Sequence, residues 1–444
     1  MQYRNYVVAT KNRRSVCIPS LFPLAMITAS TLFAHQAIAL DDLNPTYSFN
    51  GFGTLGAVYS DEDQADFVSS WLLQPNGAGH TSEWHAGVDT KLGGQLDIQF
   101  NTAFSAVLQV VVQRQNDNAW TPEIEWANIK YQFNDELSLR IGRTMLPTFM
   151  VSDTRQVGYA NPWIRGPQEV YQLNPLTNLD GLDLAYSLEL DNGRNTLQLN
   201  LGQTDGDIVH NGEITARDVI VISNSFEYDF ATFRLSYLHA TIDLNIKEAD
   251  ALINDYGTLG DALSLIPGQE DNAAEAKALS TRYVIEGDSV ELYSAGIKLE
   301  PGNWLLMGEW GHVSETGALA EVQGGYTTLA YHFSSLMPFL TLAEVNGDTP
   351  DEPGLSTTGM PPSLASTVDQ MNQGLNLLLF QASAAQKSIT AGIRWDFHPG
   401  AALKLQYQHI DMDKQSSGRL GNVQSGFTPG GTVNVFSTAI DFVF

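Results

Sequence analysis

The sequence predicts an all-β fold, a closed transmembrane antiparallel β-barrel of about 16 strands. Segments of about ten residues alternate apolar with polar side chains, and tight turns alternate with long polar loops. An apolar export segment precedes them. The rest of the chain has no stretch near the ~20 apolar residues that a membrane-spanning helix needs. A position in a membrane would therefore require strands.

Residues 1–39 are predicted to be a cleaved signal peptide. An apolar run at 21–34 follows a basic region, and Ala37-Ile38-Ala39 has the small-x-small pattern of a cleavage site. The basic residues are Arg4, Lys11, Arg13 and Arg14. Removing this segment would change the formal net charge from −27 to about −31 and would remove the single cysteine, Cys17. The barrel, residues 40–444, would then contain no disulfide.

The alternation places charged side chains opposite apolar ones within the same strand. On 182–190 the even-numbered residues are all leucine or tyrosine, while Asp183 and Glu189 lie between them. On 389–397 the apolar residues alternate with positions that include Arg394 and Asp396. Such segments have the length of a tilted strand that crosses a bilayer.

Sixteen candidate strands follow from this pattern. They lie near 46–59, 83–99, 104–114, 124–133, 137–143, 181–190, 196–202, 219–228, 230–239, 289–300, 304–312, 324–333, 337–345, 387–397, 401–412 and 432–444. Four of them, at 83–99, 219–228, 304–312 and 337–345, alternate less regularly than the others.

The connections differ in length between the two ends of the predicted strands. Tight turns such as Asp191-Asn192-Gly193 and His398-Pro399-Gly400 follow the even-numbered strands. Long polar loops follow odd-numbered strands, at 60–82, 144–180, 203–218, 240–288, 346–386 and 413–431. This sorting is typical of outer-membrane barrels, with short periplasmic turns and long extracellular loops.

The chain ends on a phenylalanine within a strongly alternating segment. The residues on one face are Phe436, Thr438, Ile440, Phe442 and Phe444. This segment resembles the closing strand of bacterial outer-membrane proteins. The resemblance implies that the barrel assembly machinery recognises Phe444 and that the protein lies in the outer membrane of a Gram-negative bacterium.

Several segments resemble a proteobacterial porin-like family. They are Glu-Ile-Glu-Trp-Ala-Asn at 123–128, Arg-Ile-Gly-Arg at 140–143 with Leu-Pro at 146–147, the segment 157–167 and Glu-Val-Tyr at 169–171. The resemblance runs from Gly51 to Phe444 and is densest between 123 and 186. It implies a general-porin-type barrel of sixteen strands, a homotrimer, and a loop near 144–180 that folds into the lumen. The short acidic loop motif of the enterobacterial general porins is not evident.

The loop near 144–180 is the predicted constriction, because sixteen strands enclose a channel too wide for side chains alone to fill. The constriction residues we predict are Arg140, Arg143, Asp153, Arg155, Arg165 and Glu169. Opposed charges there would create a transverse field that orients polar solutes. Alternatively, the prolines and Trp163 pin a surface loop at a subunit contact, with its arginines in structural pairs.

The alternation also predicts which charged residues face the lumen. They are Lys130, Asp183, Glu189, Arg234, Lys298, Glu309, Arg394, Asp396 and Lys404, together with Arg140, Glu300 and Asp441. Equal numbers of each sign place the excess acid in the outer loops, for example at 61–66. A negative vestibule concentrates cations, which predicts a weak cation preference.

The short motifs that could indicate catalysis, a cofactor or a metal are not supported by the residues around them. The glycines of 51–56 fit a dinucleotide motif, but no helix is expected after them. The acidic run 61–66 lacks the glycine and glutamate spacing of a calcium loop. We therefore predict no cofactor, no metal and no enzymatic activity. The negative charge disfavours nucleic acid as a partner and suits a surface that meets lipopolysaccharide through divalent cations.

The function that these features favour is passive diffusion of small hydrophilic solutes and ions through an outer-membrane porin. Three alternatives remain. One is a substrate-selective outer-membrane channel. Another is an outer-membrane enzyme, which needs a Ser/His/acid set near one rim. The last is a non-transporting outer-membrane or secreted all-β binding protein. Extraction only by detergent, together with heat-modifiable gel mobility, would indicate a membrane barrel instead of a secreted protein.

Overall fold

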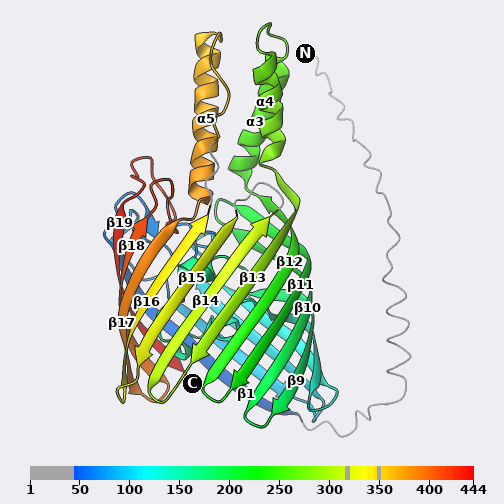
Figure 1. The fold of residues 1–444 in the computed structure, drawn as a ribbon, viewed down its shortest axis with the longest axis vertical. Coiled ribbons are helices and arrows are strands. Elements are labelled where there is room, and N and C mark those ends of the chain that lie inside the picture. Colours follow the sequence, from blue (N-terminus) through cyan, green and yellow to red (C-terminus); the bar gives the residue numbers. More distant parts are fainter. Residues whose placement is uncertain (1–44, 316–320, 348–351) are drawn as a thin grey trace, which may run out of the picture. The chain divides into compact units, whose positions relative to one another are not determined.

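The computed structural model describes residues 45–315, 321–347 and 352–444, so the predicted signal peptide lies outside the described residues. Sixteen long antiparallel strands form one closed barrel (Figure 1). Neighbouring strands follow the order of the sequence, and β1 closes the ring by pairing with both β19 and β5. The predicted fold class and strand number are confirmed.

The long strands agree closely with the sixteen predicted segments. Their bounds are β1 (Thr46–Ser60), β5 (Lys91–Gln99), β6 (Phe104–Arg114), β7 (Trp120–Gln132), β8 (Leu137–Met145), β9 (Asn178–Leu190), β10 (Gly193–Ile208), β11 (Gly212–Tyr228), β12 (Ala231–Asn245), β13 (Ile285–Leu299), β14 (Trp304–Glu315), β15 (Val322–Tyr331), β16 (Leu336–Gly347), β17 (Gln386–His398), β18 (Ala401–Met412) and β19 (Thr432–Val443).

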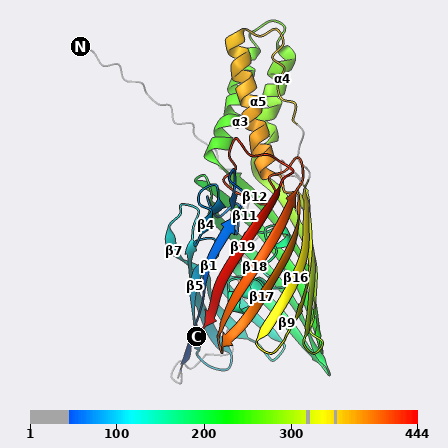
Figure 2. The same ribbon diagram turned by 90° about the vertical axis from the view of Figure 1, so that its left-hand side faces the viewer.

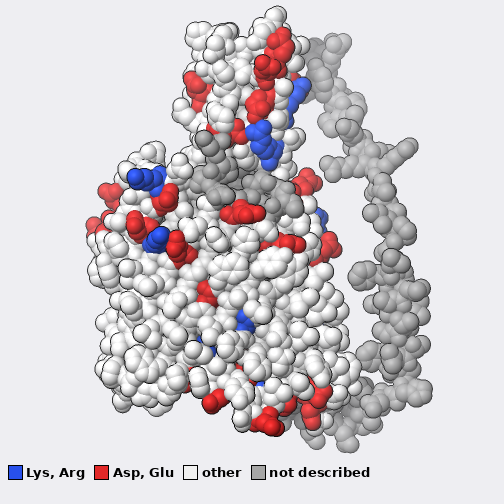
Figure 3. Space-filling view, in the orientation of Figure 1, with Lys and Arg blue, Asp and Glu red and all other residues white. Residues whose placement is uncertain are grey.

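The outer face of the barrel is apolar. On β9, Leu182 and Leu184 are 41% and 38% exposed, while Asp183 between them is only 2% exposed. Exposed aromatic residues lie beside the short turns, among them Phe133, Phe230, Trp304, Phe333 and Phe397. Charged side chains are sparse across the middle of the barrel face and gather towards its ends (Figure 3). Apolar bands bordered by aromatic residues are the surface that lipid requires.

One predicted loop is wrong. Residues 203–218 were expected to form a long polar loop, but β10 continues to Ile208 and β11 begins at Gly212. The two strands pair to the end, with Asp205 opposite Thr215, after a register shift between Gly202 and Thr204. Backbone pairing does not require apolar side chains, so a polar sequence can extend a hairpin past the apolar band.

Three helices occupy two of the predicted loops and form a bundle, which we call the helical extension (Figures 1 and 2). They are α3 (Lys247–Leu263), α4 (Glu270–Arg282) and α5 (Pro362–Ala382). Apolar residues spaced three or four apart on α3 pack against α4 and α5, in a core that includes Tyr256, Leu263, Leu279, Val368 and Leu375. In the described ranges, no helix is both long and apolar enough to span a membrane.

The connection between β8 and β9, residues 146–177, is named the inner loop. Its apolar side chains form a buried cluster with the inner faces of β11 to β16. Phe149, Trp163 and Val170 contribute from the loop, and Val221 and Leu238 from the wall. The alternation had suggested a polar inner face, but this part of the wall is apolar because the inner loop, rather than water, covers it.

A second buried cluster joins the connection at 61–90 to the connection at 413–431. Phe67, on the short strand β2 (Asp66–Phe67), packs with Leu420 and with Val435 of β19. Asp66, expected in a solvated acidic loop, is instead fully buried and accepts hydrogen bonds from Thr81 and Asn422. Its carboxylate therefore stabilises the contact between these two connections.

Candidate functional site

Charged and polar wall residues from distant strands hold the inner loop in place. The Met150 N–H donates to Glu309 of β14 at 2.7 Å, and Trp163 Nε1 donates to Thr328 of β15 at 3.0 Å. Arg234 of β12 donates to the carbonyl of Phe149 at 2.6 Å. A loop inside a barrel has no strand partner for its backbone, so wall side chains satisfy its polar groups.

Lys404 of β18 is the most strongly bound of these wall residues. Its side chain is 0% exposed and lies 2.7 Å from Asp441 of β19. The ammonium also donates to three inner-loop carbonyls, those of Gly158, Asn161 and Trp163, at 2.7 to 2.8 Å. A buried charge is stable only when it is paired and hydrogen-bonded, and this lysine has both kinds of partner.

Several of the other predicted lumen-facing residues form pairs along the wall. Arg394 contacts Asp396 at 2.8 Å and also donates to the inner-loop carbonyl of Tyr159. The remaining pairs are Arg140 with Asp183, Glu189 with Arg194, and Lys298 with Glu300. Lys130 lies opposite Arg140 in the pairing of β7 with β8. Most of these side chains therefore contact a partner on the wall or the inner loop.

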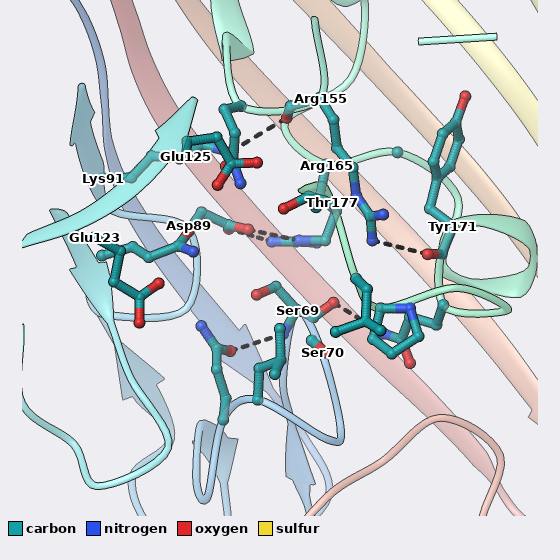
Figure 4. A pocket seen from close by; sticks show the side chains of 18 of the residues that line it. Ser69, Ser70, Asp89, Lys91, Glu123, Glu125, Arg155, Arg165, Tyr171 and Thr177 are labelled. Carbon is teal, nitrogen blue, oxygen red and sulfur yellow. Dashed lines mark hydrogen bonds and ion pairs between the residues drawn. The ribbon is translucent and has the colours of Figure 1, made fainter. Parts of the chain in front are cut away.

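A polar cavity of about 510 Å³ lies between the inner loop and the wall formed by β5, β7, β8 and β10. Charged side chains of both signs line it (Figure 4). The basic residues include Lys91, Arg143, Arg155 and Arg165, and the acidic residues include Asp89, Glu123, Glu125, Asp205 and Asp207. We call this space the polar cavity.

Two of its arginines are held in different ways. Arg165 forms a two-point ion pair with Asp89, in which Nε lies 2.8 Å from Oδ1 and Nη2 contacts Oδ2. Arg155 instead donates to the carbonyls of Tyr171 and Asn174, at 2.8 and 3.0 Å. Burial lowers the pKa of the Arg155 guanidinium, while Tyr171 and Glu125 act in the opposite direction. Its charge therefore has no carboxylate in direct contact among the described residues.

The basic and acidic groups come from different elements. Lys91 of β5 lies beside the inner loop, 3.3 Å from Gln156 Oε1 and 3.4 Å from the Arg155 carbonyl. Glu123 and Glu125 project from β7 (Figure 4). Glu125 lies close enough to Lys91 and Arg155 for both to interact with it electrostatically, so groups of both signs meet beside the inner loop.

The structure brings together three of the six predicted constriction residues, Arg143, Arg155 and Arg165. The other three lie elsewhere. Arg140 pairs with Asp183 at 2.7 Å, and Asp153 is exposed on a single helical turn. Glu169 is fully buried and accepts from Gln386 and Ser388 of β17, at 2.7 Å each. The short helix α2 (Gln168–Tyr171) directs Glu169 to the wall instead of to the cavity.

The acidic residues of the polar cavity and Lys91 were not predicted from the sequence. Alternation around the exposed Ile124 would have placed Glu123 and Glu125 on the inner face. The face on which Lys91 lies could not be predicted, because the segment 83–99 alternates poorly. In the structure this segment contains two strands, the two-residue β4 (Trp84–His85) and β5, which begins at Lys91.

The barrel wall is incomplete beside the polar cavity. The pairing of β7 with β8 ends at Ala127, and the pairing of β10 with β9 ends at Gln203. Beyond these residues the chain leaves the wall to form the inner loop, and Ile124, Asp205 and Asp207 line the cavity there. The side chain of Asn116 bridges the gap by donating to the Ile208 carbonyl at 2.9 Å.

Comparisons with known proteins support the fold. No family model and no curated protein matches the chain. Among solved structures, Salmonella typhi OmpF in complex with daunomycin is 13% identical, with a TM-score of 0.51, over 90% of this chain and 97% of that chain.

Two further solved structures are less similar. A loop L8 deletion mutant of Vibrio cholerae OmpT is 8% identical, with a TM-score of 0.48, over 90% of this chain and 99% of that chain. A mutant Rh. blastica porin is 10% identical, with a TM-score of 0.44, over 90% and 100%. The likeness to OmpF shows that this chain has the closed sixteen-stranded fold of the general porins, so the resemblance predicted from sequence is confirmed for the fold.

Proposed function

We propose that the protein is an outer-membrane channel through which small hydrophilic solutes and ions diffuse, with no catalytic step. The observation that carries this proposal is the polar cavity, which lies inside the barrel and has charges of both signs. The apolar outer face supports a position in lipid. The pore fold and the C-terminal Phe444 support the outer membrane of a Gram-negative bacterium.

The charge arrangement of the cavity suits selection by electrostatics. Lys91 and Arg155 donate to uncharged oxygens, so no contacting carboxylate of the described residues cancels their positive charge. Glu123 and Glu125 supply negative charge from β7. A field between the two groups would orient polar solutes and would give no favourable interaction to bulky apolar ones.

The proposal includes a weak cation preference, because the whole chain carries a formal charge of −27. Negative potential at the entrance raises the local concentration of cations. It also includes a homotrimer, contact with lipopolysaccharide, and recognition of Phe444 by the barrel assembly machinery. The Phe444 backbone is hydrogen-bonded in both directions with Gly51, at 2.8 and 2.9 Å, which leaves its 66% exposed ring on the outside.

Reconstitution of the purified full chain in a planar bilayer tests the proposal. We expect stepwise conductance in KCl, closure in three equal steps, and a reversal potential that favours potassium over chloride. A heat-modifiable, folded protein that gives no conductance would refute the channel. A reversal potential that favours chloride would refute the cation preference alone, and single closing steps would refute the trimer.

The substrate-selective alternative is favoured by a separate observation. A second cavity inside the barrel is lined mainly by apolar side chains, which a channel for hydrophilic solutes alone does not require.

A further inference from the structure

The second cavity, of about 220 Å³, lies between the inner loop and the inner faces of β11 to β15. We call it the apolar cavity. Leu173 and Leu176 line it from the inner loop, and Leu238, Ala240 and Leu292 line it from the wall. The apolar side chains around a cavity are stabilised when an apolar group fills it, because that group excludes water and makes van der Waals contacts with them.

Buried polar atoms without a hydrogen-bond partner occur among the residues that line the apolar cavity. They are Gln172 Oε1, Asn174 Nδ2 and Arg419 Nε, on side chains that are 6%, 8% and 5% exposed. Buried polar groups in proteins are normally satisfied, so each of these atoms requires an explanation. A ligand that has both an apolar body and a polar end would satisfy both features of the cavity.

Arg419 determines which polar end fits. In the described residues, no carboxylate lies within ion-pair distance of its guanidinium, and Glu169 is the acidic group that acts on it electrostatically. One Glu169 oxygen already accepts from Gln386 and Ser388, and the other has no hydrogen-bond partner in the described part of the chain. Burial lowers the pKa of Arg419 to about 10, so it remains a cation at neutral pH. A buried guanidinium forms its strongest hydrogen bonds with an anionic oxygen group, and a carboxylate is the smallest such group that an organic ligand of this size carries.

We propose that the apolar cavity binds one small organic anion, a carboxylate on a single ring or a short aliphatic chain, with its carboxylate on Arg419. The cavity is smaller than the ~300–1,000 Å³ sites that hold drug-sized ligands, which limits the apolar body to about one ring. The inference goes beyond the proposed function, because such binding does not depend on conductance.

Calorimetric titration of the full chain in detergent micelles tests the proposal, with empty micelles as the blank. The probe is benzoate. Benzamide has nearly the same shape without the charge, and acetate has the charge without the ring. We expect saturable binding of one benzoate per chain, at least tenfold weaker binding of benzamide, and no saturable binding of acetate. Equal binding of benzoate and benzamide, or no binding of benzoate to folded protein, would overturn the proposal.

Variants then locate the site. Arg419→Gln should weaken benzoate binding at least tenfold, and Ala240→Phe should abolish it by filling the cavity. Arg194→Gln, an exposed arginine that pairs with Glu189, is the matched control and should bind like the parent protein. Heat-modifiable gel mobility shows whether each variant has folded. A folded Ala240→Phe variant that binds benzoate normally would place the ligand elsewhere and refute the proposal.

Glu169→Gln distinguishes a ligand site from a structural pair. If Arg419 binds the ligand, removal of the Glu169 charge should tighten benzoate binding, because a competing negative charge is lost. If Arg419 and Glu169 are instead partners through water, benzoate will not bind the parent protein, and the proposal fails. Conductance in KCl is measured in parallel, so loss of benzoate binding with normal conductance leaves the channel proposal intact.

Discussion

At the scale of single residues, buried charges of the wall position the inner loop. Lys404 joins Asp441 to three backbone carbonyls, although 246 residues separate it from Gly158 in the sequence. The carbonyls need donors because they lie inside the barrel, and the ammonium needs acceptors because it is excluded from water. Each group therefore stabilises the other only in the folded barrel.

Lys404→Met should detach the inner loop, because it leaves Asp441 buried without a cation. Breaking a buried pair by removing one partner costs about 3–5 kcal/mol. We expect a lower unfolding temperature in heat-modifiability gels and a larger single-channel conductance. Lys387→Met, which removes an exposed pair with Glu344, is the control and should change neither. Unchanged heat resistance of Lys404→Met would contradict this account.

Arg155→Gln should increase cation selectivity, since it removes a positive charge that no carboxylate of the described residues contacts. The reversal potential in a KCl gradient should shift further towards potassium, while folding stays intact because glutamine can still donate to the Tyr171 or Asn174 carbonyl. Arg282→Gln, in the helical extension, is the comparison. A reversal potential as little changed as that of Arg282→Gln would show that Arg155 lies outside the ion path and would contradict this prediction.

At the scale of elements, the helical extension has its own core and its own charged network. Arg282 and the Tyr283 hydroxyl both bind the Glu352 carboxylate, at 2.6 and 2.9 Å. Burial raises the pKa of Tyr256 to about 12, and the nearby Glu352 adds to the shift. Burial, followed by the hydrogen bond and charge of Glu352, raises the pKa of Tyr283 to about 12 as well.

These shifts predict loss of the helical extension in alkali. Both phenols have folded pKa values above the ordinary value of about 10, so their stabilising effect is complete below pH 10 and is lost as the pH rises to about 12. Helical ellipticity should fall in this range, while the β-sheet signal of the barrel remains. Tyr283→Phe should make the fall smaller. A helical signal that stays constant up to pH 12 would be inconsistent with these shifts.

At the scale of the whole molecule, the outer face of the barrel is an apolar band, and its inner face has two parts with different surroundings. One part of the inner face packs against the inner loop as a hydrophobic core, and another part lines the polar cavity. The space that sixteen strands would leave open is therefore partly filled with protein. The open space that remains is the polar cavity, which lies beside β5, β7 and β10, where the wall itself is incomplete.

The apolar band on the outer face of the barrel predicts where a substitution that adds a charge is tolerated. Leu235 of β12 is 62% exposed within the band, and Leu265, after α3, is 84% exposed outside it. A charge on the lipid face near the bilayer midplane costs about 2–4 kcal/mol. Leu235→Arg should reduce assembly into membranes and thermal stability, and Leu265→Arg should do neither. Equal behaviour of the two variants, measured by membrane fractionation, would argue against a membrane position.

Alternation predicted most of the strands, because each side chain of a barrel strand faces either the outside or the inside of the barrel and the sequence records that choice residue by residue. Three strands that alternate poorly, β11, β14 and β16, place Val221, Met307 and Phe339 in the core with the inner loop. The sequence could not show this, since a strand that is apolar on both faces has no period of two.

Tertiary structure alone decided the partners of the inner loop and the composition of both cavities. The sequence located the loop and three arginines of the polar cavity, but it placed Glu169 in the constriction, whereas the structure buries Glu169 against β17. Lys91, Glu125 and Arg419 gained their positions only through closure of the barrel. Contacts across the lumen join residues far apart in the chain, and no local pattern of side chains encodes which of them will meet.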